Sequence, residues 1–75
     1  MNNAFMLRMS ERLATRLVKD AGPDLSRQID RAYRTAYGRP ATAEELPAVR
    51  AFAERHGLAA MCRGLLNSSE FLYVD

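Results

Sequence analysis

Apolar residues recur every three or four positions in the first half of the chain, which is the spacing of an amphipathic helix. Residues 4–21 follow this pattern and are closed by Gly22. Residues 24–37 keep their apolar side chains on one face, and Gly38 and Pro40 stand where a helix would end. The pattern therefore predicts two helices here.

The second half of the chain repeats this organisation around Gly57. Residues 42–56 and residues 58–66 both carry apolar stripes at helical spacing, and Gly57 separates them. Residues 67–73 begin with a second capping pattern and predict one further short helical turn. Connections this short favour helices packed side by side or at steep angles.

The sharpest local pattern is a capping box at the start of the third helix. The Thr42 hydroxyl is placed to accept from the Glu45 amide, and the Glu45 carboxylate to accept from the Thr42 amide. Pro47 follows and removes at most one hydrogen bond from the helix. At the other end of the chain, Asn2 or Asn3 is a suitable cap for the first helix.

These elements predict an all-α fold, a single domain over residues 1–75 built as a small bundle or orthogonal array of four helices plus a short C-terminal helical turn. Alanine and leucine dominate its apolar content, which favours helix over sheet. The expected core consists of Met9, Leu13, Leu17, Leu25, Ile29, Ala32, Tyr33, Ala36, Leu46, Val49, Phe52, Ala53, Met61, Leu65, Phe71 and Leu72.

Size and composition restrict the possible chemistry. The 75 residues include one cysteine and one histidine, too few for an internal disulfide or a closed zinc site. There is no glycine-rich phosphate loop, His-x-x-x-His pattern or nucleophile–base pair, so we expect no cofactor, no metal and no enzymatic activity. No apolar run approaches the roughly 20 residues of a membrane span, and the uncharged start is a poor signal peptide.

The closing residues 71–74 are all apolar or aromatic and continue to the final Asp75. Most domains end in a polar, frayed tail. We therefore expect this segment to be docked, either on its own domain or on a partner.

Three stretches resemble a known family. Residues 1–5, residues 31–45 with their Gly38-Arg39-Pro40 element, and above all residues 65–75 resemble the C-terminal segment of the planctomycete cytochrome-associated domain of unknown function. The resemblance implies that the chain is the C-terminal part of a longer, exported protein. The cysteine pair and histidine of a haem site are absent here, and the family has no established activity that the resemblance could carry over.

Two single residues are candidates for chemistry. Cys62 is either a reactive thiol or an inert one, and its apolar neighbours Met61, Leu65 and Leu66 favour an inert thiol in or beside the core. His56 is either a general base or a surface residue in the last turn of its helix, and no partner at readable spacing supports the catalytic role.

A row of basic residues is the best candidate for an anion-binding surface. It consists of Arg8, Arg12, Arg16 and Lys19, and we expect Glu11 and Asp20 to pair with Arg8 and Arg16. A second row, residues 27–34, is broken by an acid in the same way.

The chain carries 11 basic and 9 acidic residues, a net charge of +2, which is ordinary for a solvated surface. A helix-turn-helix would place residues 42–56 in a DNA groove, but three glutamates there oppose phosphate contact. Nucleic acid is therefore an unfavoured partner, and a small arginine-rich nucleic-acid-binding or regulatory domain is the alternative function.

The tyrosines Tyr33, Tyr37 and Tyr73 are either a stacking platform for a ligand or core residues whose hydroxyls reach polar partners, and the second interpretation is the commoner one. Met6 and Met9 are typical gap-filling core residues.

The first helix carries more apolar side chains than one packed face can cover. Its candidate interaction surface is Phe5, Met6, Leu7, Met9 and Val18. The preferred hypothesis is a non-catalytic structural or interaction module that packs on the rest of a larger exported protein or on a second copy of itself, with no membrane and no small-molecule substrate inferred.

Overall fold

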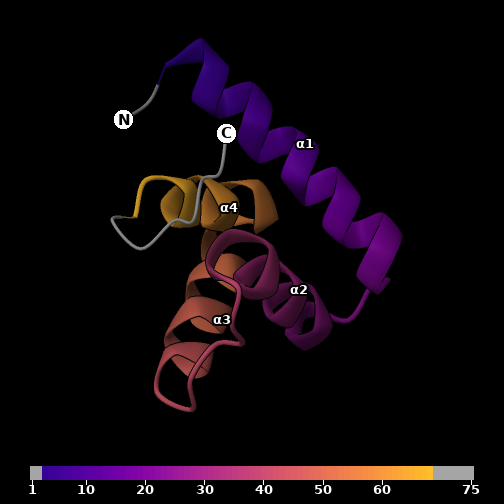
Figure 1. The fold of residues 1–75 in the computed structure, drawn as a ribbon, viewed down its shortest axis with the longest axis vertical. Helices are drawn as coiled ribbons and strands as arrows, with labels where there is room; N and C mark the ends of the chain where they lie inside the picture. Colours follow the sequence, from indigo (N-terminus) through magenta and orange to yellow (C-terminus); the bar gives the residue numbers. More distant parts are fainter. Residues whose placement is uncertain (1–2, 69–75) are drawn as a thin grey trace.

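The structure is a computed structural model that describes residues 3–68, and within them the fold is all-α, as the sequence predicts (Figure 1). Its four helices are α1, Ala4–Ala21; α2, Leu25–Tyr37; α3, Glu45–His56; and α4, Leu58–Leu66. The expected core residues Phe71 and Leu72 lie outside the described residues, and so do residues 69–73 of the expected helical turn over residues 67–73.

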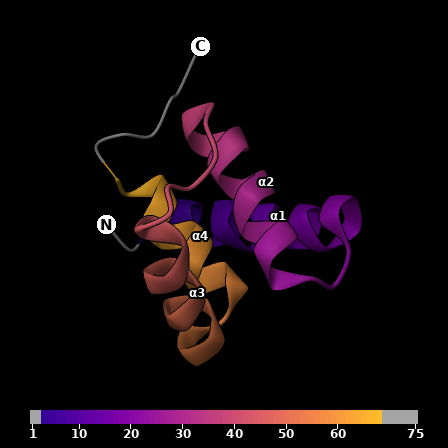
Figure 2. The same ribbon diagram turned by 90° about the horizontal axis from the view of Figure 1, so that it is seen from below.

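The long helix α1 lies along one side of the molecule, and the other three helices gather on its inner face (Figure 1). Helix α1 packs mainly against α4 and also against α2, whereas within residues 3–68 no Cα atom of α1 comes within 8 Å of a Cα atom of α3. Viewed from below, α2 crosses α1, and α3 and α4 lie side by side (Figure 2). The outer face of α1 is therefore uncovered along its length.

Side-chain caps fix where α1 and α2 begin. The Asn3 carboxamide accepts a hydrogen bond from the Met6 amide at 2.8 Å, so Asn3 is the cap of α1. The Asp24 carboxylate accepts from the Arg27 amide at 3.0 Å, which makes Asp24 the cap of α2 rather than its first residue. Gly38 ends α2 in the left-handed conformation, with φ of 71°, that glycine adopts without strain.

The capping box ahead of α3 forms as expected. The Glu45 amide donates to the Thr42 hydroxyl at 3.1 Å, and the Thr42 amide donates to the Glu45 carboxylate at 2.9 Å. The regular helix nevertheless begins at Glu45, three residues later than predicted. Pro47 has no amide hydrogen to donate to the Ala43 carbonyl, so the first turn lacks one hydrogen bond of the helical ladder.

The core is centred on α2, whose inner face is buried along its whole length. Ten hydrophobic residues form the buried cluster, and seven partly buried ones pack around it. The buried members are Leu17, Ile29, Ala32, Tyr33, Ala36, Tyr37, Ala53, Met61, Cys62 and Leu65. Of the other expected core residues that are described, Met9, Leu13, Leu25, Leu46 and Val49 are half-buried.

One core prediction is wrong: Phe52 is 44% exposed. Its helical spacing places it on the apolar side of α3, but the part of α4 beside it offers Gly64, which has no side chain to cover the ring. Two polar residues are buried instead, Ser10 and Gln28. Each side chain makes a hydrogen bond to a backbone carbonyl nearby in the sequence. The Ser10 hydroxyl donates to the Met6 carbonyl at 2.7 Å, and the Gln28 side-chain amide donates to the Gly22 carbonyl at 2.6 Å.

Candidate interaction surfaces

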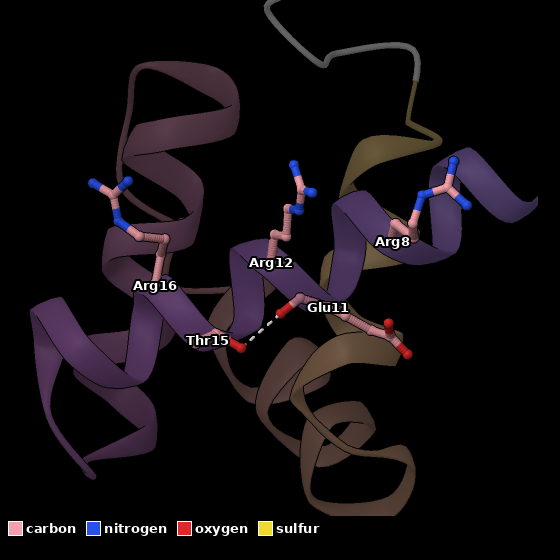
Figure 3. Close-up of a pocket in the computed structure, with 5 residues that line it drawn as sticks. All are labelled: Arg8, Glu11, Arg12, Thr15 and Arg16. Carbon is pink, nitrogen blue, oxygen red and sulfur yellow. Dashed lines mark hydrogen bonds between the residues drawn. The ribbon is translucent and has the colours of Figure 1, made fainter.

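The predicted basic row runs along the uncovered face of α1. Arg8, Arg12, Arg16 and Lys19 are all exposed. In Figure 3 the guanidinium groups of Arg8, Arg12 and Arg16 leave the helix toward the same side. Residues four apart rise about 6 Å along a helix, so the three guanidinium groups form a spaced line and not a cluster converging on one point.

The acids next to this row differ in what they do. Asp20 pairs with Arg16 at 3.4 Å, as expected, and also with Arg31 of α2 at 3.6 Å. The expected pair between Glu11 and Arg8 does not form within the described residues, and the Glu11 carboxylate points away from the basic side (Figure 3). Glu11 is engaged through its backbone, because its carbonyl accepts the Thr15 hydroxyl at 3.0 Å.

The five apolar candidates on α1 divide into two groups. Phe5 is 60% exposed, Val18 51% and Leu7 41%. Met6 and Met9 are half-buried, in keeping with a gap-filling role. The exposed part of the predicted surface is therefore Phe5, Leu7 and Val18.

Helix geometry separates these three side chains. Leu7 and Val18 are eleven positions apart, close to three full turns, so they share one side of α1 about 16 Å apart along the axis. The half-buried Ala14 and the exposed Glu11 lie between them on the same side. Phe5 precedes Leu7 by two positions and leaves the helix about 160° away. We refer to Leu7, Ala14 and Val18 as the α1 flank; Phe5 is not part of it.

A second apolar surface, not foreseen as a site, lies between α3 and α4. It is a shallow groove of about 270 Å³ lined almost wholly by apolar atoms. Its lining residues are Ala48, Val49, Phe52, Met61, Gly64 and Leu65. A methyl group placed on Gly64 would meet no other atom within 4 Å, so the groove is open above that residue. We call it the α3–α4 groove.

A smaller depression adjoins the groove on the outer side of Phe52. It is lined by Ala48, Ala51, Phe52, Arg55 and His56. The His56 imidazole is exposed and lies against the Phe52 ring with 4.7 Å between ring centres. His56 is therefore a surface residue, as its position at the end of α3 indicates.

Cys62 is fully buried in α4, and burial raises the pKa of its thiol to about 12. Because the thiolate is the reactive species, a thiol with this pKa is almost wholly protonated at neutral pH. The structure thus favours the inert interpretation of Cys62.

Tyr33 and Tyr37 are core residues. Their rings pack edge to face with centres 5.1 Å apart, and the Tyr37 hydroxyl donates to the Leu65 carbonyl at 3.2 Å. The Arg39 guanidinium lies 5.5 Å from each ring centre and also makes a two-pronged pair with Glu45, at 2.8 and 3.0 Å. Tyr73, the third member of the predicted set, lies outside the described residues.

The Arg39–Glu45 pair ties the end of α2 to the start of α3. The hydrogen bonds from the Arg39 guanidinium and then from the Thr42 amide lower the pKa of the Glu45 carboxyl from 4.5 to about 2. Sequence reasoning found the capping box but not this pair, because only the turn after Gly38 brings Arg39 back toward α3.

In the helix-turn-helix interpretation, α3 would have to meet phosphate groups. Two of its glutamates are already engaged with arginines, Glu45 with Arg39 and Glu54 with Arg50 at 3.4 Å. Arg50 also donates to the Ser26 hydroxyl of α2, which fixes α3 against that helix.

Within residues 3–68, no group of three or more metal-ligating side chains gathers in one place. None of the described helices combines the length and apolarity that crossing a membrane requires. Comparison of the chain with protein-family models, with curated proteins and with solved structures gives no match.

Proposed function

We propose that this chain is a non-catalytic packing module that docks on other protein, either the rest of a larger exported protein or a second copy of itself. The observation that carries the proposal is the exposure of Leu7 and Val18 on one side of a helix, next to the face that packs against α4 and α2. Exposed apolar side chains that share a helix face are typical of surfaces that a protein partner covers.

The resemblance to the C-terminal segment of an exported planctomycete domain supports the first form of this proposal. In such a parent protein the α1 flank would be covered by residues that belong to neither α2 nor α4. In the chain by itself, the same flank is open to a second copy.

Sedimentation velocity over a concentration series, from about 10 μM to 1 mM, tests the proposal. We expect the weight-average mass to rise with concentration, and Leu7→Glu with Val18→Glu to keep the chain monomeric. Arg12→Gln with Lys19→Gln is the matched control, since it lowers the net charge by the same two units at exposed positions of the same helix about 100° or more around from the flank. A monomer at every concentration would exclude self-association. Failure of the flank variant to weaken docking on the parent protein's remaining part would then exclude the first form as well.

The second candidate is an arginine-rich nucleic-acid-binding domain, favoured by one observation: within the described chain, Arg8 and Arg12 have no acidic partner. It predicts duplex binding that weakens steeply with salt and disappears on Arg8→Glu with Arg12→Glu. The control Arg27→Glu with Arg55→Glu makes the same change in net charge elsewhere. A low-salt gel-shift assay without any shift would exclude this candidate.

A further inference from the structure

The α3–α4 groove leaves an apolar surface open beside the C-terminal end of α4. Phe52 stands at its rim with 44% of its surface exposed, and Met61 and Leu65 supply buried side chains at its base. Its size, about 270 Å³, is near the lower end of pockets that hold small organic molecules. Almost no polar atom lines it, so the groove suits one or two apolar side chains and offers no hydrogen bonds to orient a polar ligand.

We propose that residues 71–74 of this chain, Phe71-Leu72-Tyr73-Val74, pack into the α3–α4 groove of the same molecule. These residues lie outside the described part of the chain, and the inference rests on the place where the chain leaves α4 and on the apolar character of its last residues. It concerns a different surface from the α1 flank, so it stands or falls independently of the proposed function.

The groove is within reach of the segment. Gly64 and Leu65 line it, and the last described residue, Ser68, comes three positions after Leu65. The Ser68 amide donates to the Leu65 carbonyl at 3.1 Å, which closes a turn directly after α4. A chain advances at most about 3.5 Å per residue, so Phe71 can lie up to roughly 10 Å from Ser68. From Leu65 back to Met61 the groove runs along α4 for only about 6 Å.

The chemistry of the segment matches that of the groove. Four consecutive apolar or aromatic residues stand between the acids Glu70 and Asp75. The adjoining depression presents Arg55, which has no ion pair among the residues that the structure describes. An apolar run flanked by acids is therefore complementary in chemistry to an apolar groove flanked by a guanidinium group.

Covalent connection favours this occupant over a second copy. A segment tethered by a short linker is present at an effective concentration in the millimolar range. A second molecule would have to exceed that concentration to compete for the groove, so at ordinary protein concentrations the chain's own segment occupies it.

Nuclear Overhauser spectroscopy on the full 75-residue chain tests the proposal directly. We expect contacts from the Phe71 ring to the methyl groups of Val49, Met61 and Leu65. A sample that mixes labelled with unlabelled chains separates the two sources, because contacts within one molecule do not appear in the isotope-filtered spectrum. Absence of contacts between residues 71–74 and the groove, or their appearance only between labelled and unlabelled molecules, would overturn the proposal.

Thermal unfolding supplies an independent arm. Phe71→Ala is expected to lower the Tm by about 6 °C or more, because burial of a phenylalanine contributes about 1.5–3 kcal/mol and 1 kcal/mol corresponds to about 4–8 °C in a domain of this size. Phe5→Ala is the matched control, since Phe5 is a phenylalanine with 60% of its surface exposed on another helix, and it should lower the Tm by less than about 2 °C. Phe52→Ala should remove most of the effect of Phe71→Ala when the two are combined. Equal Tm values for the Phe71→Ala and unchanged chains would count against groove packing.

Discussion

The hydroxyl of Tyr37 links two helices that are far apart in the sequence, and its removal tests whether this tyrosine serves the core. Tyr37 is buried at the end of α2, and its hydroxyl donates to the Leu65 carbonyl near the end of α4 at 3.2 Å. Tyr37→Phe removes that hydrogen bond and leaves the ring and its edge-to-face contact with Tyr33 in place.

The size of the effect depends on the groups that the substitution leaves behind. The Leu65 carbonyl also accepts the Ser68 amide at 3.1 Å, so it keeps one partner after the hydroxyl is lost. The cost is then that of one neutral hydrogen bond, about 0.5–1 kcal/mol. For a domain of this length it corresponds to a fall in Tm of roughly 2–8 °C. Tyr37→Ala would also remove the ring and should cost about 3–5 kcal/mol.

Urea denaturation followed by circular dichroism measures both variants. Thr15→Val is the control, because it removes an exposed hydrogen bond to a carbonyl one turn away and should change the free energy of unfolding by less than about 0.5 kcal/mol. We expect all m-values to agree, so that the midpoints report stability. If Tyr37→Phe is as stable as the unchanged chain, the hydroxyl does not hold α2 to α4 and the argument for a core role fails.

Three further predictions concern other parts of the molecule. Because the pKa of Glu45 is held at about 2 in the folded chain, the stability that the ionised Glu45 carboxylate contributes is complete above about pH 4.5 and is lost as the pH falls toward 2. Between pH 4.5 and 2, the Tm of Glu45→Gln should therefore fall less steeply than the Tm of the unchanged chain. Cys62, with a pKa of about 12 and full burial, should react with a thiol reagent at about pH 8 only at the rate of unfolding, and fast labelling of the native chain would contradict its placement. Gly38→Ala should cost about 1 kcal/mol, since φ of 71° strains any residue with a Cβ, and an unchanged urea midpoint would show that α2 does not end in this conformation.

Helix ends were largely predictable because the groups that define them are close in sequence. The caps at Asn3 and Asp24 act within three residues, and Gly38 acts through its own backbone. The start of α3 was placed three residues early, although the capping box itself formed. That error arose from Pro47, whose missing amide affects the regular helix more than the cap.

The core was predictable where one helix supplies most of it. The inner face of α2 repeats apolar residues over its whole length, so its buried side could be identified without knowing its neighbours. Phe52 was misplaced because its burial depends on the residues that α4 presents opposite it, and periodicity within α3 carries no information about Gly64. Sequence reasoning also missed the contacts of Arg39 with Tyr33, Tyr37 and Glu45, which depend on the path of the turn between α2 and α3.

The candidate surfaces were also predictable only where they depend on residues of one helix. Helical spacing was sufficient to place the basic row on one side of α1, and its members are indeed exposed. The direction of the Glu11 side chain was not predictable, because a carboxylate three residues from an arginine can turn toward it or away. The α3–α4 groove could not be foreseen, since it results from the meeting of two helices and from one glycine between larger residues.

The central claim is that the α1 flank is a protein-docking surface, and a concentration series of methyl-selective NMR spectra tests it residue by residue. The account predicts that raising the concentration of the chain shifts the methyl signals of Leu7, Ala14 and Val18 together, while those of the buried Ile29 stay in place. Signals from the flank that do not move up to millimolar concentration, and do not move when the remainder of the proposed parent protein is added, would contradict it.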